Sequence, residues 1–186
     1  MRTPRYTDRL VIRPFRLEDR AAASKLWAVT FHATLTEERL LWMALTPAQL
    51  EDLQQPPIGD RAVLLRDTGT LVGVVGLTYT NGPYSLLDVT PPVGTSLPWT
   101  LEIGLFWAVH PDHRGCGYAT EAARSMIGLA TDHVRVPRVI AHTEHHNTPS
   151  RGVMERLGMD IQSFHDVPHA PWFQIVGQLP TLQSPG

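Results

Sequence analysis

The sequence predicts an α/β (α+β) protein in which strands and helices contribute to one mixed sheet. Three observations predict this class. Short runs rich in branched apolar residues are typical of strands, longer stretches with apolar residues on one side are typical of helices, and the two kinds of segment alternate along the chain. With 186 residues, 42% hydrophobic and 18% charged, the chain fits one globular domain with a buried core.

The N-terminal part is predicted to hold one strand and two helical segments. Residues 9–15 are short and rich in branched side chains, which is typical of a strand. Helical periodicity follows from residue 17, with acidic residues in the first turn. A second helical segment covers residues 37–53. Within it, Thr46 and Pro47 have the pattern of an N-cap followed by proline at the first helical position, which predicts an interruption.

Two apolar runs in the middle of the chain predict a β-hairpin. Residues 62–65 and 71–79 are joined by the turn sequence Asp-Thr-Gly-Thr at 67–70. Residues 81–98 then carry four prolines and two glycines. We interpret them as an insertion between strands, because loops of this length inside a domain are usually functional. Residues 1–186 are therefore expected to form a single domain with an insertion at about 81–98.

The C-terminal half is predicted to continue the alternation of strands and helices. Its expected elements are a strand at 101–109, a helix at 118–133, a strand at 138–142, a helix at 148–157, and two weaker strands at 160–164 and 172–179. The helix at 148–157 is expected to have Thr148 as N-cap, Pro149 at its first position and Gly158 as its stop.

Charge and cysteine content argue against several classes of protein. The formal net charge is -2 and the sequence has no block of Lys or Arg, so a general nucleic-acid binder is not expected. Cys116 is the only cysteine, which excludes a disulfide within the chain and favours a reducing compartment. The start of the sequence has no secretory signal pattern, and no run of eighteen apolar residues predicts a membrane span. We therefore expect a cytoplasmic protein.

A glycine-rich segment between the strand at 101–109 and the helix at 118–133 predicts an anion site. Glycines let the backbone curl so that several N–H groups point to one place, and the helix start adds its positive dipole end. A pyrophosphate is an anion of the right kind. The segment consists of Arg114, Gly115, Cys116, Gly117, Tyr118 and Ala119.

Two common phosphate-binding loops do not fit this segment. A Walker loop ends in Gly-Lys-Ser/Thr, which is absent here, and the dinucleotide fingerprint requires glycine where Thr120 stands. A third pattern does fit. Arg114, Gly117 and Ala119 match the acetyl-CoA loop written Arg/Gln-x-x-Gly-x-Gly/Ala.

Further motifs surround this loop. Thr7–Phe15 reads TDRLVIRPF, and the span Leu101–Met159 contains EIG, VHPDHRGCGYATEA, NTPS and ERLGM in order. With these motifs the chain resembles the GNAT superfamily of N-acetyltransferases, and within it the branch of the ribosomal-protein alanine N-acetyltransferases. The resemblance implies a mixed, splayed sheet flanked by helices. It also implies transfer of the acetyl group of acetyl-CoA to a primary amine by direct attack in a ternary complex.

The resemblance also implies which residues bind the co-substrate acetyl-CoA. The backbone of Val109 would face the pantetheine and the thioester oxygen. Residues 114–119 would cradle the pyrophosphate, and Asn147 would hold the pantetheine arm. A helix cap alone is the alternative role for Asn147, although capping and pantetheine contact are compatible. Cys116 need not be a nucleophile, because direct attack requires no covalent enzyme intermediate.

The catalytic candidates are also implied by the resemblance. An ammonium substrate must lose a proton before attack, and the departing thiolate gains one. Glu102 matches the glutamate of the EIG motif, and His142 on the next strand is the alternative base. Ser150 is the candidate acid, while Met154 stands where some relatives have a tyrosine acid. Glu102 as a surface carboxylate and Ser150 as a polar first-turn residue remain alternatives.

The expected partners follow from this interpretation. An amine-bearing acceptor, either a small molecule or a protein N-terminus, is expected, with no nucleic acid and no membrane; a homodimer remains open. His142, Glu144 and His146 could share one strand face as metal ligands, but loop histidines are more often solvated, and no metal is expected. A rival function is a catalytically silent module that binds coenzyme A or another ligand as a sensor.

Overall fold

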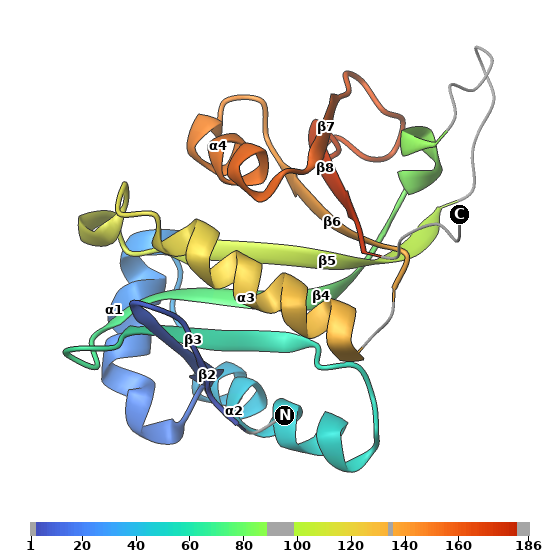
Figure 1. The fold of residues 1–186 in the computed structure, drawn as a ribbon. Helices are drawn as coiled ribbons and strands as arrows, with labels where there is room; N and C mark the ends of the chain where they lie inside the picture. Colours follow the sequence, from blue (N-terminus) through green and yellow to red (C-terminus); the bar gives the residue numbers. More distant parts are fainter. Residues whose placement is uncertain (1–2, 89–98, 134–135, 182–186) are drawn as a thin grey trace. The chain divides into compact units, whose positions relative to one another are not determined.

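The structure of the protein is a computed structural model that describes residues 3–88, 99–133 and 136–181. The described residues form an open, mixed sheet with the hydrogen-bonded strand order β1-β2-β3-β4-β5-β6-β8-β7, together with four α-helices (Figure 1). This confirms the predicted mixed α/β class. The chain divides into two compact units, one made of Met1–Leu77 and Leu105–Val134, the other of Thr78–Gly104 and Arg135–Gly186.

The first unit contains an antiparallel run of strands. β1 (Arg5–Tyr6), β2 (Leu10–Pro14), β3 (Gly59–Leu65) and β4 (Leu71–Gly82) pair successively, and β4 continues into the second unit. The predicted hairpin between β3 and β4 is confirmed, with Gly69 at φ 69° in its turn. β1 is too short for sequence periodicity to reveal it.

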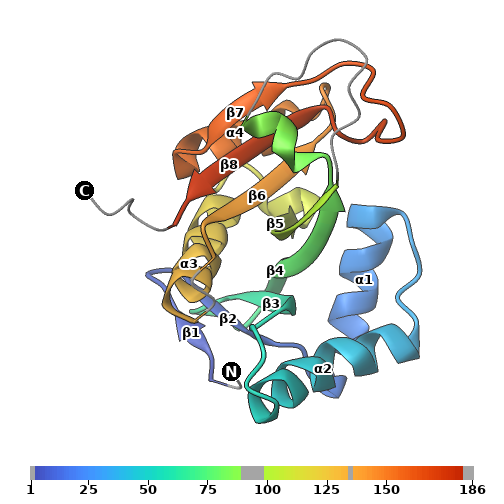
Figure 2. The ribbon, with the colours of Figure 1, turned by 90° about the vertical axis from the view of Figure 1, so that its right-hand side faces the viewer.

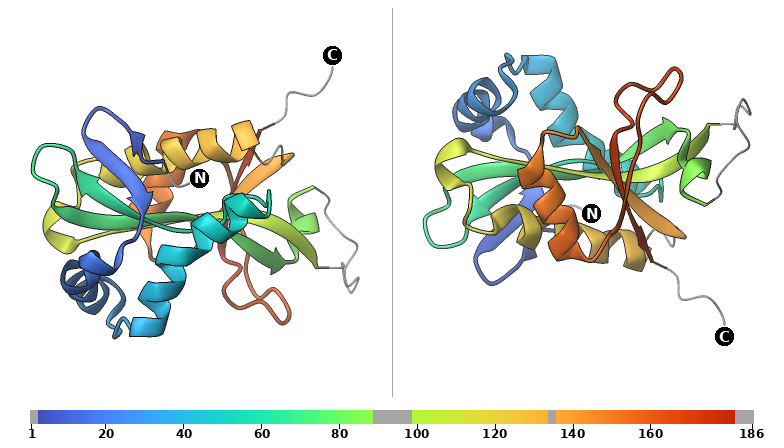
Figure 3. Two further views of the ribbon diagram at one scale, coloured as in Figure 1. Left: turned by 90° about the horizontal axis from the view of Figure 1, so that it is seen from below. Right: turned by 90° about the horizontal axis from the view of Figure 1, so that it is seen from above.

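Three helices pack on the strands of the first unit. α1 (Arg20–Phe31) and α2 (Glu37–Asp52) lie on one face, and α3 (Tyr118–His133) lies on the other (Figure 3). Because side chains alternate across a strand, Ala62 and Leu64 of β3 join the core under α1 and α2. That core is built from Phe15, Ala23, Leu26, Trp27, Leu35, Leu40, Met43, Ala62, Leu64 and Val74.

One predicted feature of the helices is wrong. α2 is continuous from Glu37 to Asp52 and carries Pro47 in its interior, so Thr46 and Pro47 do not start a new helix. Thr36 caps α2 instead, with its side chain accepting a hydrogen bond from the backbone N–H of Arg39 at 3.2 Å. Leu40, Met43 and Pro47 are buried along one side of α2, and this packing outweighs the backbone hydrogen bond that proline removes.

The second unit contains the other end of the sheet. β5 (Thr100–Val109) enters from this unit and pairs in parallel with β6 (Arg138–Thr143) at Ile103 with Val139 and Gly104 with Ile140. β8 (Ile175–Pro180) is antiparallel to both β6 and β7 (Asp160–Ser163), so these three strands lie side by side (Figure 2). α4 (Thr148–Leu157) connects β6 to β7.

The described part of the predicted insertion belongs to this unit. Residues 81–82 still belong to β4, and a short 3-10 helix, Tyr84–Leu87, follows. Tyr84 is fully buried with Ile140, Phe173 and Val176, so this segment is part of the core of the unit. Residues 89–98 of the predicted insertion lie outside the described residues. Among the described residues, no helix is both long and apolar enough to cross a membrane.

Candidate active site

The glycine-rich loop lies in the first unit, between the end of β5 and the start of α3. A short 3-10 helix, Pro111–His113, turns the chain after Val109. The N–H of His110 donates to the carbonyl of Val72 at 2.8 Å, and Nε of Arg114 donates to the carbonyl of Val109 at 3.1 Å. The structure therefore brings Val109 and Arg114, two predicted coenzyme residues, into direct contact.

Two glycines give the loop its shape. Gly115 has φ 76° and Gly117 has φ 81°, in the left-handed region that favours glycine. The carbonyl of Gly117 accepts the backbone N–H of Glu121 at 3.1 Å, which makes Gly117 the residue that opens the hydrogen-bond pattern of α3. Glycine has no side chain to cap a helix, so position 117 leaves the first N–H groups of α3 to other acceptors.

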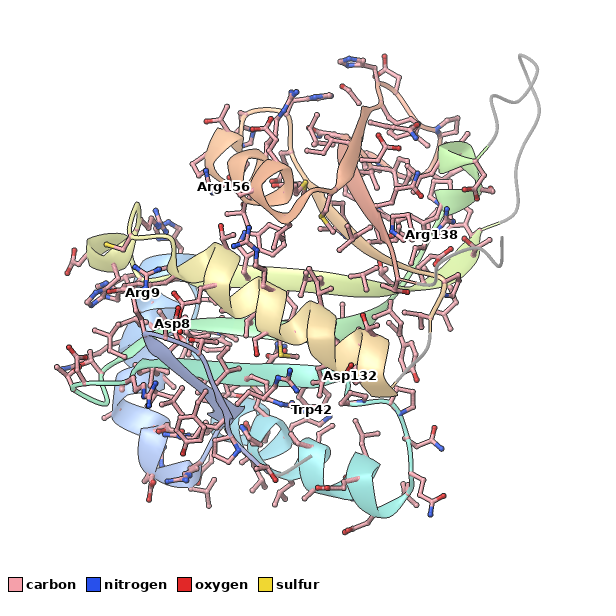
Figure 4. All side chains as sticks on the ribbon, viewed as in Figure 1. Asp8, Arg9, Trp42, Asp132, Arg138 and Arg156 are labelled. Carbon is pink, nitrogen blue, oxygen red and sulfur yellow. The ribbon has the colours of Figure 1, made fainter. Side chains whose placement is uncertain are left out.

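An arginine from the bend before β2 contacts this loop. Nη1 of Arg9 donates to the carbonyl of Cys116 at 2.9 Å, and the guanidinium lies 4.8 Å from the ring centre of Tyr118. Nη2 of Arg9 also lies 2.7 Å from the carboxylate of Glu121 in α3. Figure 4 labels Arg9 near the start of α3. Neither Arg9 nor Glu121 was predicted from the sequence as a residue of the site. The available signal was that both belong to the motifs that carry the family resemblance.

Glu102, the first base candidate, lies in the second unit and has a charged partner. Its Oε1 accepts from Nη2 of Arg138 at 2.8 Å, and the two side chains are 13% and 14% exposed. Nη1 of Arg138 also pairs with Asp88 at 2.6 Å. Desolvation opposes the charge of Arg138, but the two carboxylates together hold its pKa above the ordinary value. Glu102 therefore connects the start of β5 to the start of β6.

His142, the second base candidate, lies near the end of β6 in the same unit. Its ring centre is 4.8 Å from that of Trp172. The side chain has an exposed face, yet the surrounding protein atoms desolvate the imidazole and lower the pKa of His142, while Glu144 acts in the opposite direction. A histidine with a lowered pKa is neutral at pH 7, which is the state a proton acceptor needs.

Asn147 and Ser150 meet at the start of α4. Oδ1 of Asn147 accepts the backbone N–H of Ser150 at 3.2 Å, so Asn147 is the N-cap and the prediction of Thr148 as N-cap is wrong. Thr148 therefore occupies the first helical position and Pro149 the second, where the N–H that proline lacks has no partner within the helix in any case. The predicted stop is confirmed, with Gly158 at φ 78°. Ser150 is half-buried.

The remaining candidates have simpler environments. Cys116 is exposed, and its Sγ lies 3.6 Å from the carbonyl of Arg114 within the loop. In the part of the chain that the structure describes, no group of three His, Cys, Asp or Glu side chains could hold a metal ion. The structure thus groups the predicted residues into three sets: the loop with Val109, the Asn147–Ser150 pair, and Glu102 and His142 with partners of their own.

Comparison with known proteins identifies the family. The sequence profile of the acetyltransferase (GNAT) domain matches residues 9–160. An N-acetyltransferase of Bacillus subtilis, YnaD, is 26% identical over 165 residues, covering 85% of this chain and 83% of its own. The chain belongs to the GNAT family, and it is an acyltransferase.

Solved structures agree with this fold. The ribosomal-protein-S5-alanine acetyltransferase of Vibrio fischeri matches with a TM-score of 0.66 at 12% identity, covering 96% of this chain and 97% of that one. RimJ of Mycobacterium smegmatis, solved in complex with CoA-disulfide, matches with a TM-score of 0.58 at 20% identity, covering 92% and 81%. At these identities the likeness concerns the fold alone.

Proposed function

We propose that this acetyltransferase moves the acetyl group of acetyl-CoA to a primary amine of its acceptor by direct attack in a ternary complex. The observation that carries the proposal is the loop at 114–119, where left-handed Gly115 and Gly117 precede a helix that opens on glycine. Backbone N–H groups at such a helix start, strengthened by the helix dipole, favour a pyrophosphate.

The space around Gly117 also favours glycine at this position of the loop. A Cβ added at Gly117 would meet Nη2 of Arg9 at 3.3 Å, and its φ of 81° strains any other residue. Glycine is therefore favoured at 117, where the backbone is left-handed and lies next to Arg9, and it leaves the backbone open to an approaching anion. Residues 114–119 are proposed to bind the diphosphate, the backbone of Val109 the thioester end, and Asn147 the pantetheine arm.

The proton transfers are assigned to residues of the second unit. His142 is proposed as the base, because its lowered pKa keeps the imidazole neutral and ready to accept the ammonium proton. Glu102 is the alternative base. The ion pair with Arg138 supports a structural positioning role for Glu102 at least as well as the role of base. A carboxylate that accepts a proton weakens its ion pair with the guanidinium, so the ion pair opposes proton transfer to Glu102.

Ser150 is proposed as the acid that protonates the departing thiolate. Its backbone N–H is committed to the cap with Asn147, whereas the hydroxyl belongs to the side chain at the third position of α4. A hydroxyl at a helix N-terminus lies in a positive field, which favours a neighbouring anion such as a thiolate. The positive end of α4 would thereby stabilise the departing thiolate until Ser150 protonates it.

The acceptor is proposed to be a primary amine, with a protein N-terminus as the first class to test. Structural likeness to the Vibrio fischeri enzyme, whose name specifies a ribosomal-protein alanine, motivates this choice. We further propose that residues 1–186 act as one catalytic domain, with an insertion at about 81–98, and that the enzyme acts in the cytoplasm. The single cysteine supports that location.

The function is tested by following thiol release from acetyl-CoA with a panel of amines. The panel contains N-terminal peptides beginning with Ala or Ser, the same peptides with a blocked N-terminus, polyamines and free amino acids. Turnover with any free amine, lost when that amine is blocked, supports the proposal. Acetyl-CoA binding without turnover on every amine contradicts it and favours the catalytically silent module instead.

A further inference from the structure

Arg9 makes contacts that none of the proposed catalytic steps uses. Besides its pair with Glu121, it donates from Nη1 to the carbonyl of Cys116, in the middle of the loop. Glu121 in turn accepts from Oγ1 of Thr7 at 2.5 Å and from the backbone N–H of Arg9 at 3.0 Å. Both carboxylate oxygens are therefore bound to the segment 7–9, which lies 112 residues away in the sequence.

The contact at Cys116 has a direct effect on the neighbouring residue. A trans peptide is planar, so its carbonyl and the following N–H point in opposite directions. When Arg9 holds the carbonyl of Cys116, it also fixes the direction of the Gly117 N–H, which faces away from the guanidinium. Gly115 and Gly117 are both left-handed and have many accessible conformations, so this peptide needs an external constraint.

The ion pair also changes the charge at the start of α3. Glu121 is an acid in the first turn, where its negative charge would repel a bound diphosphate. Burial tends to raise the pKa of Glu121, but hydrogen bonds from Thr7 and Arg9 outweigh this and lower it, so the carboxylate stays charged. The guanidinium of Arg9, 2.7 Å away, offsets that charge.

We propose that Arg9 is a positioning residue of the coenzyme site. Held by Glu121, it orients the peptide between Cys116 and Gly117 so that the Gly117 N–H can bind the diphosphate. This inference rests on the proposed function of the loop and deepens it. The segment before β2 then takes part in binding acetyl-CoA, in addition to its structural role in the sheet.

Arg5 provides a control, because this arginine of β1 also contacts α3. Its Nε donates to Oγ of Ser125 at 3.0 Å, and its Nη2 would lie 3.3 Å from a Cβ at Gly128. Arg5 therefore connects β1 to α3, whereas Arg9 connects the bend before β2 to α3; the contact of Arg5 lies one turn further along the helix, away from the loop. A variant of Arg5 removes an arginine contact with α3, here to the neutral Ser125, without touching residues 114–119.

The experiment compares the parent, Arg9→Ala, Arg9→Lys, Glu121→Gln and Arg5→Ala. Acetyl-CoA is titrated by calorimetry, and unfolding in urea is measured for each variant. Cys116, the only cysteine, is labelled with a maleimide in the absence of acetyl-CoA, which reports the state of the loop itself. Loss of Arg9 is expected to raise the Kd for acetyl-CoA about tenfold and to speed labelling of Cys116. Arg5→Ala is expected to change neither by more than about twofold.

The outcomes distinguish failure of the proposed role of Arg9 from failure of the proposed function of the loop. If the parent binds acetyl-CoA and folded Arg9→Ala binds it equally well, Arg9 has no positioning role and the proposed loop function stands. Arg9→Lys keeps the charge but lacks the planar fork that reaches Cys116 and Glu121 together, so recovery of the parental Kd by Lys would refute the orienting contact. If the parent itself does not bind acetyl-CoA, the proposed loop function fails, and this inference fails with it.

Discussion

The N-termini of α3 and α4 differ in whether a side chain accepts their first backbone N–H groups. Every α-helix begins with backbone N–H groups that lack partners within the helix. α4 satisfies one of them itself, because Oδ1 of Asn147 accepts the N–H of Ser150. α3 begins at Tyr118, and Gly117 before it has no side chain that could cap the helix; the loop is shaped by two left-handed glycines and held by Arg9.

This difference separates a helix start that stabilises the fold from one suited to a ligand. At α4 the cap is internal, and the amide nitrogen of Asn147 can still donate to a pantetheine, so capping and binding are compatible. At α3 the residue at the N-cap position, Gly117, has no side chain to accept these N–H groups, which leaves room for the diphosphate proposed above. Substitutions at the two helix starts should therefore affect different quantities. At α4 they should lower the free energy of unfolding, and at α3 they should weaken the binding of acetyl-CoA.

The largest effect is expected from Gly117→Val. A β-branched side chain is strained at φ 81° and would press on Nη2 of Arg9, so we expect acetyl-CoA binding to weaken by about 100-fold or more. Gly69→Val is the matched control, because Gly69 has φ 69° in the hairpin turn and nothing within 4 Å of an added Cβ. Calorimetric titration is the measurement. Equal binding by both folded variants would contradict the assignment of the loop.

The next effect is expected at Ser150. Its backbone N–H makes the cap, so Ser150→Ala should leave α4 and the Kd for acetyl-CoA nearly unchanged while turnover falls about 100-fold. Single-turnover measurements with an amine identified in the panel give the chemical step. A parental rate for that step would remove Ser150 from the mechanism and leave it as a first-turn polar residue.

A smaller effect distinguishes the two roles of Asn147. Asn147→Ala should lower the free energy of unfolding by about 1 kcal/mol, the usual value for a lost N-cap. Asn147→Asp keeps an oxygen acceptor but has no amide N–H to donate. We expect Asp to restore stability and not the Kd for acetyl-CoA. Full recovery of both by Asp would show that Asn147 is a cap alone.

The smallest and most specific effect concerns pH. Desolvation lowers the pKa of His142, so the rate should rise with pH through a limb below the usual value of about 6.5 and be level at pH 7. His142→Ala should lower the rate and remove that limb. Two amines of different basicity separate this limb from titration of the acceptor. If the limb persists in His142→Ala and disappears in Glu102→Gln, Glu102 is the base.

Local sequence patterns determined much of this protein. The mixed class, the extent of α3, the stop at Gly158 and the glycine positions of the loop were all predicted, because propensities and backbone freedom act within a few residues. The cap at Asn147 is also local, but the sequence offers both Asn147 and Thr148 as acceptable caps before Pro149, and local pattern does not decide between them.

Other features depend on contacts between distant parts of the chain, and only the tertiary structure decided them. Burial keeps α2 continuous through Pro47, against a local signal for a break. Glu102 is bound to Arg138, and Arg9 reaches a loop that lies more than a hundred residues further on. Sequence periodicity reports which face of an element is apolar, but the partner of an individual charge is set by how the elements pack.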